Sequence, residues 1–97
     1  MTNYNVTFLK AVADENRIKI MDLLKQGPMC VSEVCKHFAM KQPSVSHHLT
    51  ILKSAGIVSA EKFGKEVRYT LNDKYVCSCC ENILTRYSED GEVRSDE

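Results

Sequence analysis

The stretch QPSVSHHLTILKSAGIVSAEKFGKEVRYTLN, residues 42–72, changes its hydrophobic period part-way along. In its first half, apolar side chains recur at the spacing of one helix face: Val45, Leu49 and Leu52. From Ile57 onward apolar and polar residues alternate, as they do in a strand, and a Gly64-Lys65 pair interrupts the alternation with a turn. The stretch therefore predicts a helix followed by a two-stranded hairpin.

The rest of the chain is predicted to be mainly helical. A first helix has an apolar stripe made of Val6, Leu9, Val12 and Ala13, with help from Phe8. A second helix begins after an Asp14 cap and stops at the QGP of residues 26–28, and a third has one buried face over residues 31–38. A last helix runs from an Asp73 cap to Tyr87.

These elements follow the order α-α-α-α-β-β-α, a mainly α fold with a small β-hairpin. Two short helices joined by a tight turn and followed by a basic hairpin form a winged helix-turn-helix, whose second helix enters the major groove of DNA. We expect one small domain over residues 1–87, to which pairing with a second copy would add buried surface. Residues 88–97 are acidic and almost free of apolar side chains, which predicts a disordered tail.

The charges of the chain are unevenly distributed, although the formal net charge is zero. Residues 36–75 carry seven basic and three acidic side chains, whereas residues 76–97 carry two basic and six acidic ones. A basic middle segment fits a surface that faces DNA, followed by a solvated end. Ordinary surface charge is the alternative interpretation.

The helix predicted over residues 42–54 turns polar side chains away from its apolar stripe. Hydroxyl, amide, imidazole and ammonium groups on such a helix can reach base edges and phosphates. The candidate DNA contacts on or beside it are Lys41, Gln42, Ser44, Ser46, His47, Thr50 and Lys53, and those on the hairpin are Lys62, Lys65 and Arg68. His48 follows Val45 by three residues on the core side, so we expect a packed, hydrogen-bonded structural histidine there.

The chain contains five cysteines: Cys30, Cys35, Cys77, Cys79 and Cys80. Its start, MTNYNVTFLK, has neither the basic end nor the apolar run of a signal peptide, and no segment approaches about 18 uninterrupted apolar residues. We therefore expect a cytoplasmic location and no contact with a membrane. In that reducing compartment, an odd number of cysteines indicates thiols, metal ligands or redox sensors rather than a disulfide framework.

Cys30 stands where serine or threonine usually begins a helix, because residues 30–33 have the spacing of a capping box with Glu33 as its last member. A thiol is a poor cap, but the free N–H groups and the helix dipole at this position favour the thiolate, which binds metals. A tolerated small residue is the alternative. Cys35 lies on the predicted buried face, about 140° round the helix from Cys30, which favours core packing.

The sequence VCSCCEN, residues 76–82, holds three cysteines in four residues, which core packing alone does not explain. At about 100° per residue, Cys77 and Cys80 can share a helix face. Cys79 can join them only if the first turn unwinds or if two subunits contribute ligands. Three thiolates suit As(III) or Sb(III), and four suit Zn(II) or Cd(II).

The segments FLKAVADENRIKIMDLLKQG (8–27), VSEVCKHF (31–38) and residues 42–72 resemble the ArsR/SmtB family of prokaryotic metal-sensing repressors. The resemblance covers roughly residues 6–87. It implies a homodimer, joined by its first and last helices, that occupies double-stranded operator DNA and leaves it when a soft metal or metalloid binds. It also implies that the Ser-His-His-Leu helix reads the DNA.

The arsenic-sensing branch of this family is similar at Cys30 and Cys35, where it reads C-V-C-x-x-C, but Ser32 replaces the middle ligand. Residues 1–29 lack the cysteines by which cadmium- and lead-sensing relatives complete a related site, and the last helix lacks the histidines of zinc- and cobalt-sensing relatives. The resemblance therefore favours As(III) or Sb(III) as inducer, with Cd(II), Zn(II) or Pb(II) as alternatives. The candidate ligands are Cys77, Cys79, Cys80, Cys30 and Cys35.

Two other functions are compatible with the sequence. One is a thiol redox or persulfide sensor of the same fold, in which Cys30 or Cys35 pairs with a C-terminal cysteine, and the other is a DNA-binding module whose cysteines are incidental. An enzyme is disfavoured, because the histidines lie in or near the DNA-reading unit and no Gly-rich phosphate loop is present. Whether the two cysteine groups form one site, two sites or a redox pair stays open at this point.

Overall fold

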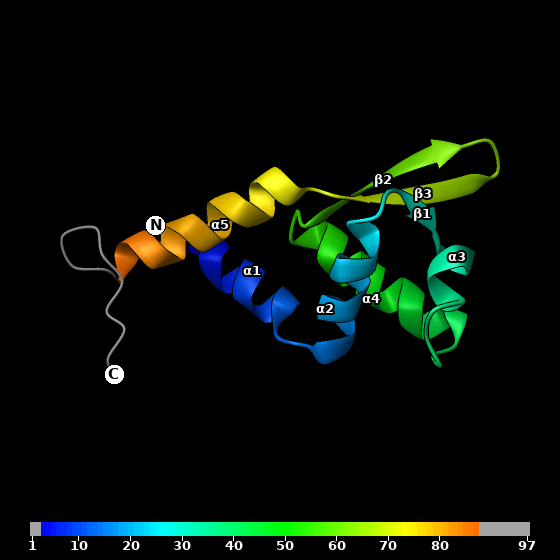
Figure 1. Cartoon of the computed structure of the whole chain (residues 1–97), viewed down its shortest axis with the longest axis horizontal. Coiled ribbons are helices and arrows are strands. Elements are labelled where there is room, and N and C mark those ends of the chain that lie inside the picture. Colours follow the sequence, from blue (N-terminus) through cyan, green and yellow to red (C-terminus); the bar gives the residue numbers. More distant parts are fainter. Residues whose placement is uncertain (1–2, 88–97) are drawn as a thin grey trace.

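The structure, a computed structural model, describes residues 3–87. In chain order its elements are α1 (Asn3–Val12), α2 (Glu15–Leu24), β1 (Met29–Cys30), α3 (Val31–Cys35), α4 (Gln42–Ser54), β2 (Val58–Phe63), β3 (Glu66–Leu71) and α5 (Asp73–Arg86). Helices α1 and α5 pack together and extend away from the end of the molecule that carries the sheet and α3 (Figure 1). The predicted tail, residues 88–97, lies outside the described residues.

Local signals at the helix ends account for the helical part of this order. The Asp14 carboxylate accepts hydrogen bonds from the backbone N–H groups of Asn16, at 2.8 Å, and Arg17, at 3.1 Å, so the predicted cap of α2 is confirmed. Proline in the first turn of α4 lacks the backbone N–H that would have no intrahelical partner at this position. Gly56, at φ 80°, turns the chain out of α4 toward the sheet.

The sheet has three antiparallel strands in the order β1-β3-β2, one more than the predicted hairpin. The predicted turn is confirmed: Gly64 and Lys65 join β2 to β3, with Phe63 opposite Glu66. The additional strand, β1, pairs its two residues with Tyr69 and Arg68 of β3. The predicted two-stranded hairpin is confirmed as β2 and β3. The third strand was not predicted, because two residues are too few for an alternating pattern to show in the sequence.

Three predicted helices differ from the observed ones. The N-cap of α5 is Asn72 instead of the predicted Asp73, which is the first residue of the helix. The third predicted helix ends at Cys35 instead of residue 38, although Phe38 still packs half-buried against the core. In α1 the buried side chains are Phe8 and Ala11, whereas Val6 is 49% exposed and Leu9 is 46% exposed. The predicted stripe of α1 is therefore wrong as a description of its core face, because part of that stripe is left uncovered.

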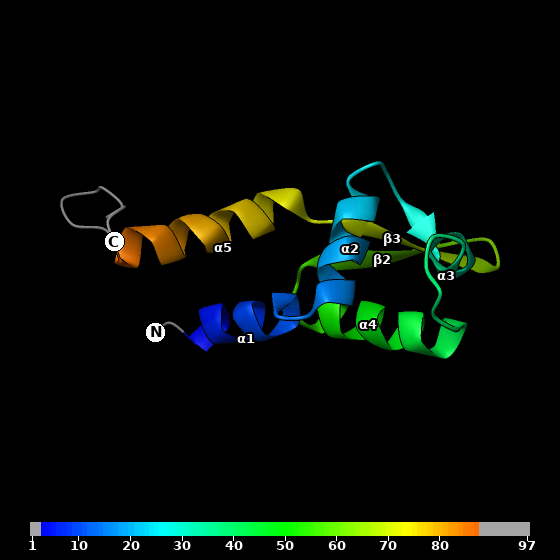
Figure 2. The same ribbon diagram turned by 60° about the horizontal axis from the view of Figure 1, so that its bottom comes forward.

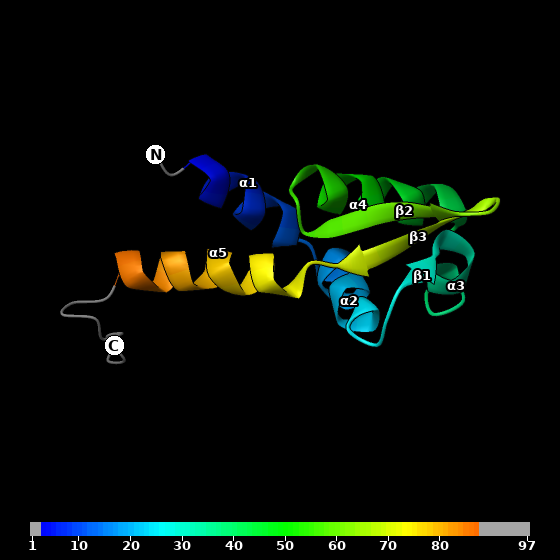
Figure 3. The same cartoon turned by 90° about the horizontal axis from the view of Figure 1, so that it is seen from above.

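The core lies where α2, α3 and α4 meet the base of the sheet. Its largest fully buried side chains are Ile20, Leu49, Leu52, Ile57, Val34, Val45 and Val58. Seen from the directions of Figures 2 and 3, α4 lies along one side of this core and α1 continues the same side toward the free ends of α1 and α5. None of the helices that the structure describes is long and apolar enough to cross a membrane.

Candidate DNA-binding surface and cysteine groups

Helix α4 presents the predicted DNA contacts on its outer face. Val45, Leu49 and Leu52 are buried completely, so the opposite face is turned to solvent. The exposed members of the predicted set are Lys41, Gln42, Ser44, His47, Thr50 and Lys53, and Ser46 is half-buried. The Thr50 hydroxyl donates to the Ser46 carbonyl at 2.9 Å, which leaves its oxygen as an acceptor.

The wing formed by β2 and β3 carries exposed cations near its tip. Lys62 and Lys65 are exposed, and within residues 3–87 neither forms an ion pair. Arg68 is also exposed, but its Nε lies 3.9 Å from Glu66 Oε1 and its guanidinium stacks 4.9 Å from the centroid of the Phe63 ring. Of the three candidate phosphate contacts, the two lysines are therefore the more available and Arg68 is the more fixed.

At the start of α3, Cys30 and Glu33 form the predicted capping box, with the Cys30 side chain facing the Glu33 backbone N–H and the Glu33 side chain facing the Cys30 backbone N–H. The Cys30 backbone N–H donates to Glu33 Oε1 at 3.0 Å, and this bond lowers the pKa of Glu33, with a smaller contribution from the charge of Arg68. The Cys30 Sγ lies 3.1 Å from the Ser32 hydroxyl and is almost buried, at 7% exposure. Ser32, which stands in the place of the middle ligand of the arsenic-sensing pattern, is thus a hydrogen-bond partner of Cys30.

The five cysteines are free thiols in different environments. Cys79 belongs to the core at 2% exposure and Cys35 is half-buried, whereas Cys77 and Cys80 are exposed on α5. The Cys77 thiol lies 3.9 Å from the Glu81 carboxylate. No group of three His, Cys, Asp or Glu side chains within residues 3–87 is arranged to hold a metal ion.

Cys77 and Cys80 open onto different hollows on either side of α5. Cys80 lies in an apolar groove of about 480 Å³, which we call the α1–α5 groove. Its lining residues are Phe8, Leu9, Val12, Ile18, Met21, Val76, Cys80, Ile83 and Leu84. Cys77 lines a second hollow of about 730 Å³, together with Lys25, Gly27 and Asp73 among others. Leu84, at 51% exposure, is among the apolar side chains that the single chain leaves uncovered in the groove.

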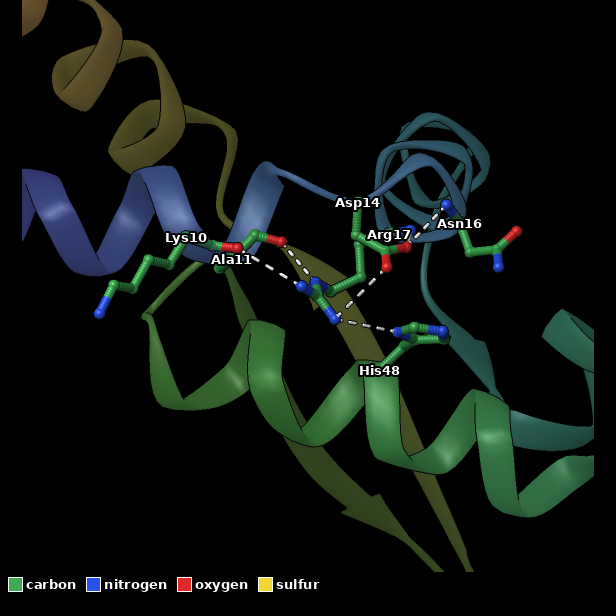
Figure 4. A network of polar contacts seen from close by, with 6 residues as sticks. All are labelled: Lys10, Ala11, Asp14, Asn16, Arg17 and His48. Atoms are coloured by element: carbon green, nitrogen blue, oxygen red, sulfur yellow. Dashed lines mark hydrogen bonds and ion pairs between the residues drawn. The ribbon is translucent and has the colours of Figure 1, made fainter.

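A polar network joins the end of α1, the start of α2 and the inner side of α4 (Figure 4). The Arg17 guanidinium donates to the Ala11 carbonyl and lies 3.2 Å from His48 Nδ1 and 4.0 Å from Asp14 Oδ2. His48 is therefore the packed, hydrogen-bonded histidine that its spacing predicted. The pKa of Asp14 is lowered, mainly because its carboxylate accepts a hydrogen bond from the backbone N–H of Arg17. The charges of Arg17 and His48 act in the same direction.

A recognition helix, a basic wing and a core shared between them define a winged helix-turn-helix regulator of transcription. Residues 14–60 match the family described as "Bacterial regulatory protein, arsR family". The transcriptional repressor SdpR of Bacillus subtilis (strain 168) is 46% identical over 63 residues, which are 65% of this chain and 70% of SdpR. The arsenical resistance operon repressor of Staphylococcus xylosus is 34% identical over 77 residues, 79% of this chain and 74% of that protein.

The chain therefore belongs to the ArsR family, and it is a transcription regulator rather than an enzyme. Its fold is also that of a solved domain from Mycobacterium bovis, described as a homodimeric winged helix-turn-helix DNA-binding domain. That domain has a TM-score of 0.74 and 23% sequence identity, and the similarity covers 97% of this chain and 89% of the domain.

Proposed function

We propose that the protein is a homodimeric repressor that binds double-stranded operator DNA and leaves it when As(III) or Sb(III) binds to its cysteine thiolates. Cd(II), Zn(II) and Pb(II) are the alternative inducers. The observation that carries this proposal is the pair of exposed thiols, Cys77 and Cys80, on the same helix that bounds the uncovered α1–α5 groove. An effector bound there would act on the surface through which two subunits meet.

The DNA-binding part of the proposal rests on α4 and the wing. The outer face of α4 offers hydroxyl, amide, imidazole and ammonium groups, the types that contact base edges and phosphates. Lys62 and Lys65 add exposed positive charge at the wing. In a dimer, two copies of α4 would enter successive major grooves about 34 Å apart.

The second copy is proposed to cover the α1–α5 groove. Val6, Leu9, Ile18 and Leu84 are between 41% and 51% exposed in the single chain, an arrangement typical of an interface rather than of a free surface. Covering them removes apolar area from water, which favours association. The solved M. bovis domain, described as homodimeric, supports this arrangement.

The thiol part of the proposal requires ligands from more than one place. Cys77 and Cys80 supply two thiolates, and a three-thiolate site would take its third from the second subunit or from Cys79 after the first turns of α5 open. Cys30 and Cys35 are candidates for a second group, which would need α3 to open because Cys30 is buried. The name of the S. xylosus relative, an arsenical resistance operon repressor, agrees with a metalloid effector.

Release would follow from linkage between the two sites. If bound metalloid holds α5 in a subunit arrangement that spaces the two α4 helices wrongly for DNA, operator affinity falls by the coupling factor. Coupling of about 1–3 kcal/mol corresponds to a loss of roughly 5- to 150-fold.

The test is fluorescence anisotropy of the reduced protein on its own promoter DNA, under anaerobic conditions. As(III), Cd(II), Zn(II) and an organic persulfide are added in separate titrations. We expect release by As(III) and a weak response to Zn(II), with loss of the As(III) response in the Cys77→Ser/Cys80→Ser variant and its retention in the matched Cys35→Ser variant.

The other outcomes assign the function differently. If only Cys35→Ser loses the As(III) response, the metalloid site is formed by Cys30 and Cys35 instead. Release by persulfide alone makes the protein a redox sensor. No release by any of the four reagents, with intact operator binding, makes it a repressor whose cysteines do not sense these effectors.

A further inference from the structure

The hairpin of β2 and β3 has an inner face that continues the core and an outer face that is exposed. Side chains alternate between the two faces of a strand, so Lys62 lies on the same face as Val58, which is 2% exposed. Arg68 lies on the outer face, because its neighbour Tyr69 packs against the core. Lys62 and Arg68 are therefore exposed cations on opposite faces of the wing.

Neighbours on the outer face hold the Arg68 side chain. The central carbon of its guanidinium lies 4.9 Å from the centroid of the Phe63 ring, and its Nε lies 3.9 Å from Glu66 Oε1. Phe63 and Glu66 stand opposite each other in the pair nearest the turn, so Arg68 reaches along the wing toward its tip. A guanidinium that stacks on an aromatic ring and faces a carboxylate is restricted in direction.

Arg68 also lies where the wing meets α3. Its backbone pairs with Cys30 of β1, and α3 begins at the next residue. The pKa of Glu33 in α3 is lowered mainly by its bond to the Cys30 backbone N–H, and the charge of Arg68 acts in the same direction. Arg68 thus interacts with one carboxylate of the wing and with one carboxylate of α3.

We infer that Arg68 is a positioning residue for DNA binding, which holds the wing in place beside α3 through Phe63, Glu66 and Glu33 and does not itself bind a phosphate. This inference rests on the proposed DNA-binding role of α4 and the wing. Strand β1 contributes only two residues to the junction, so a side chain that connects the wing to α3 adds to a short contact. Without Arg68 the DNA complex would keep its phosphate contacts, but binding would also have to order the wing, which lowers affinity.

The first test compares Arg68→Gln with Lys62→Gln, since each removes one positive charge from the wing. Anisotropy on promoter DNA at several salt concentrations gives the affinity and its salt dependence. In Lys62→Gln the slope of log affinity against log salt concentration should become shallower by about 0.9. In Arg68→Gln the slope should equal that of the wild type, while affinity falls about fivefold at every salt concentration. A shallower slope in Arg68→Gln would make Arg68 a phosphate contact and overturn the inference.

The second test uses the sign of the effect at Glu33. Gln at this position keeps the capping box and removes only the charge. Loss of a negative charge ordinarily strengthens binding to DNA, whereas the inference predicts that Glu33→Gln binds about threefold more weakly. The same change in Arg68→Gln should have no further effect, because the two side chains act together.

Glu15→Gln is the control for this second test, since Glu15 pairs with Lys19 on α2 at 3.4 Å, and it should not weaken binding. Unchanged or stronger binding by Glu33→Gln would overturn the inference. So would losses that add in the double variant.

A third test needs no DNA. Backbone ¹⁵N relaxation of the free protein gives order parameters for residues 62–67, which should fall in Arg68→Gln and stay unchanged in Lys62→Gln. Equal order parameters in both variants would refute the positioning role. If the wild-type protein binds no promoter DNA while the order parameters behave as expected, the proposed function has failed and the role of Arg68 in holding the wing stands.

Discussion

Tyr75, in the first turn of α5, lies against Gly56, the residue at which the chain leaves α4. A Cβ atom on Gly56 would stand 3.3 Å from Tyr75 Cε2, and Gly56 has φ 80°. The Asn72 side chain reinforces the junction by donating to the Gly56 carbonyl at 2.9 Å. The end of α4, the candidate DNA-binding helix, is thus packed directly on the start of the helix that carries the exposed thiols.

Replacing Gly56 by Ala should destabilise the protein by about 2–3 kcal/mol, because the side chain adds crowding against Tyr75 to the unfavourable backbone conformation. Gly64→Ala is the control, since Gly64 also has positive φ but nothing within 4 Å of its Cβ position. It should lose only about 1 kcal/mol. Urea unfolding at one fixed protein concentration measures both, and equal losses would mean that Tyr75 yields without penalty.

Leu84→Glu should prevent pairing through the α1–α5 groove. Losing one buried leucine from each subunit of a symmetric dimer removes about 3–6 kcal/mol of association free energy, a rise in the dissociation constant of more than about 100-fold. Sedimentation equilibrium should show monomers, and operator affinity should fall with it. Phe63→Glu, at an equally exposed apolar site on the wing, should remain dimeric. If Leu84→Glu and Phe63→Glu are both dimeric, the two subunits do not meet at the α1–α5 groove.

Lys62→Ala and Lys65→Ala should each weaken operator binding without changing its preference among DNA sequences. The slope of log affinity against log salt concentration should become shallower by about 0.9 for each phosphate that is no longer neutralised. Lys19→Ala is the control, because Lys19 pairs with Glu15 at 3.4 Å on α2. Anisotropy titrations at several salt concentrations measure the slopes. An unchanged slope in both wing variants would show that the wing lysines do not contact the DNA phosphates.

Acid should destabilise the protein through Asp14. Its pKa is lowered from the ordinary value of 3.8 in the folded state, so its stabilising effect is present above that value and is lost as pH falls through the lower folded value. Asp14→Ser keeps a capping oxygen but cannot titrate, so its free energy of unfolding should decline less between pH 5 and pH 2.5. Denaturant unfolding across this range checks the difference, and parallel profiles would contradict it.

Cys79→Ser should destabilise the protein by about 1–3 kcal/mol, because it places a hydroxyl among apolar side chains at a site that is 2% exposed. Cys77→Ser, on the exposed side of the same helix, should change stability by less than about 0.5 kcal/mol. Thermal unfolding compares the two. A harmless Cys79→Ser would show that α5 opens readily at this position, which would favour Cys79 as a ligand.

The parts of the fold that the sequence predicted well are those with a long, regular pattern. In α4 the apolar stripe spans several turns, and the Gly64-Lys65 turn has only one compatible strand register. Strand β1 could not be predicted, because its two residues are held by pairing with β3, far along the chain. Its signal lies in the partner strand rather than in its own residues.

For α1 and α5, periodicity identified the helices but not the direction in which each face points. Helix α1 has apolar residues on two sides, and only tertiary packing shows that Phe8 is buried while Leu9 is exposed. The same limit applies to Cys79, which spacing separated from Cys77 and Cys80 without showing that it belongs to the core. The predicted DNA contacts and thiol ligands remain predictions, since their partners lie outside the chain.

The order of the strands also governs how copies of the protein can aggregate. β3 is paired on both sides, and the two edges of the sheet are a strand of two residues and β2, which carries the exposed charges of Glu61 and Lys62. Short or charged edges resist the addition of further strands. Growth by strand addition is thus disfavoured at the sheet end. If the α1–α5 groove is the interface of a symmetric dimer, as proposed above, association would stop at a closed pair instead of continuing into a fibre.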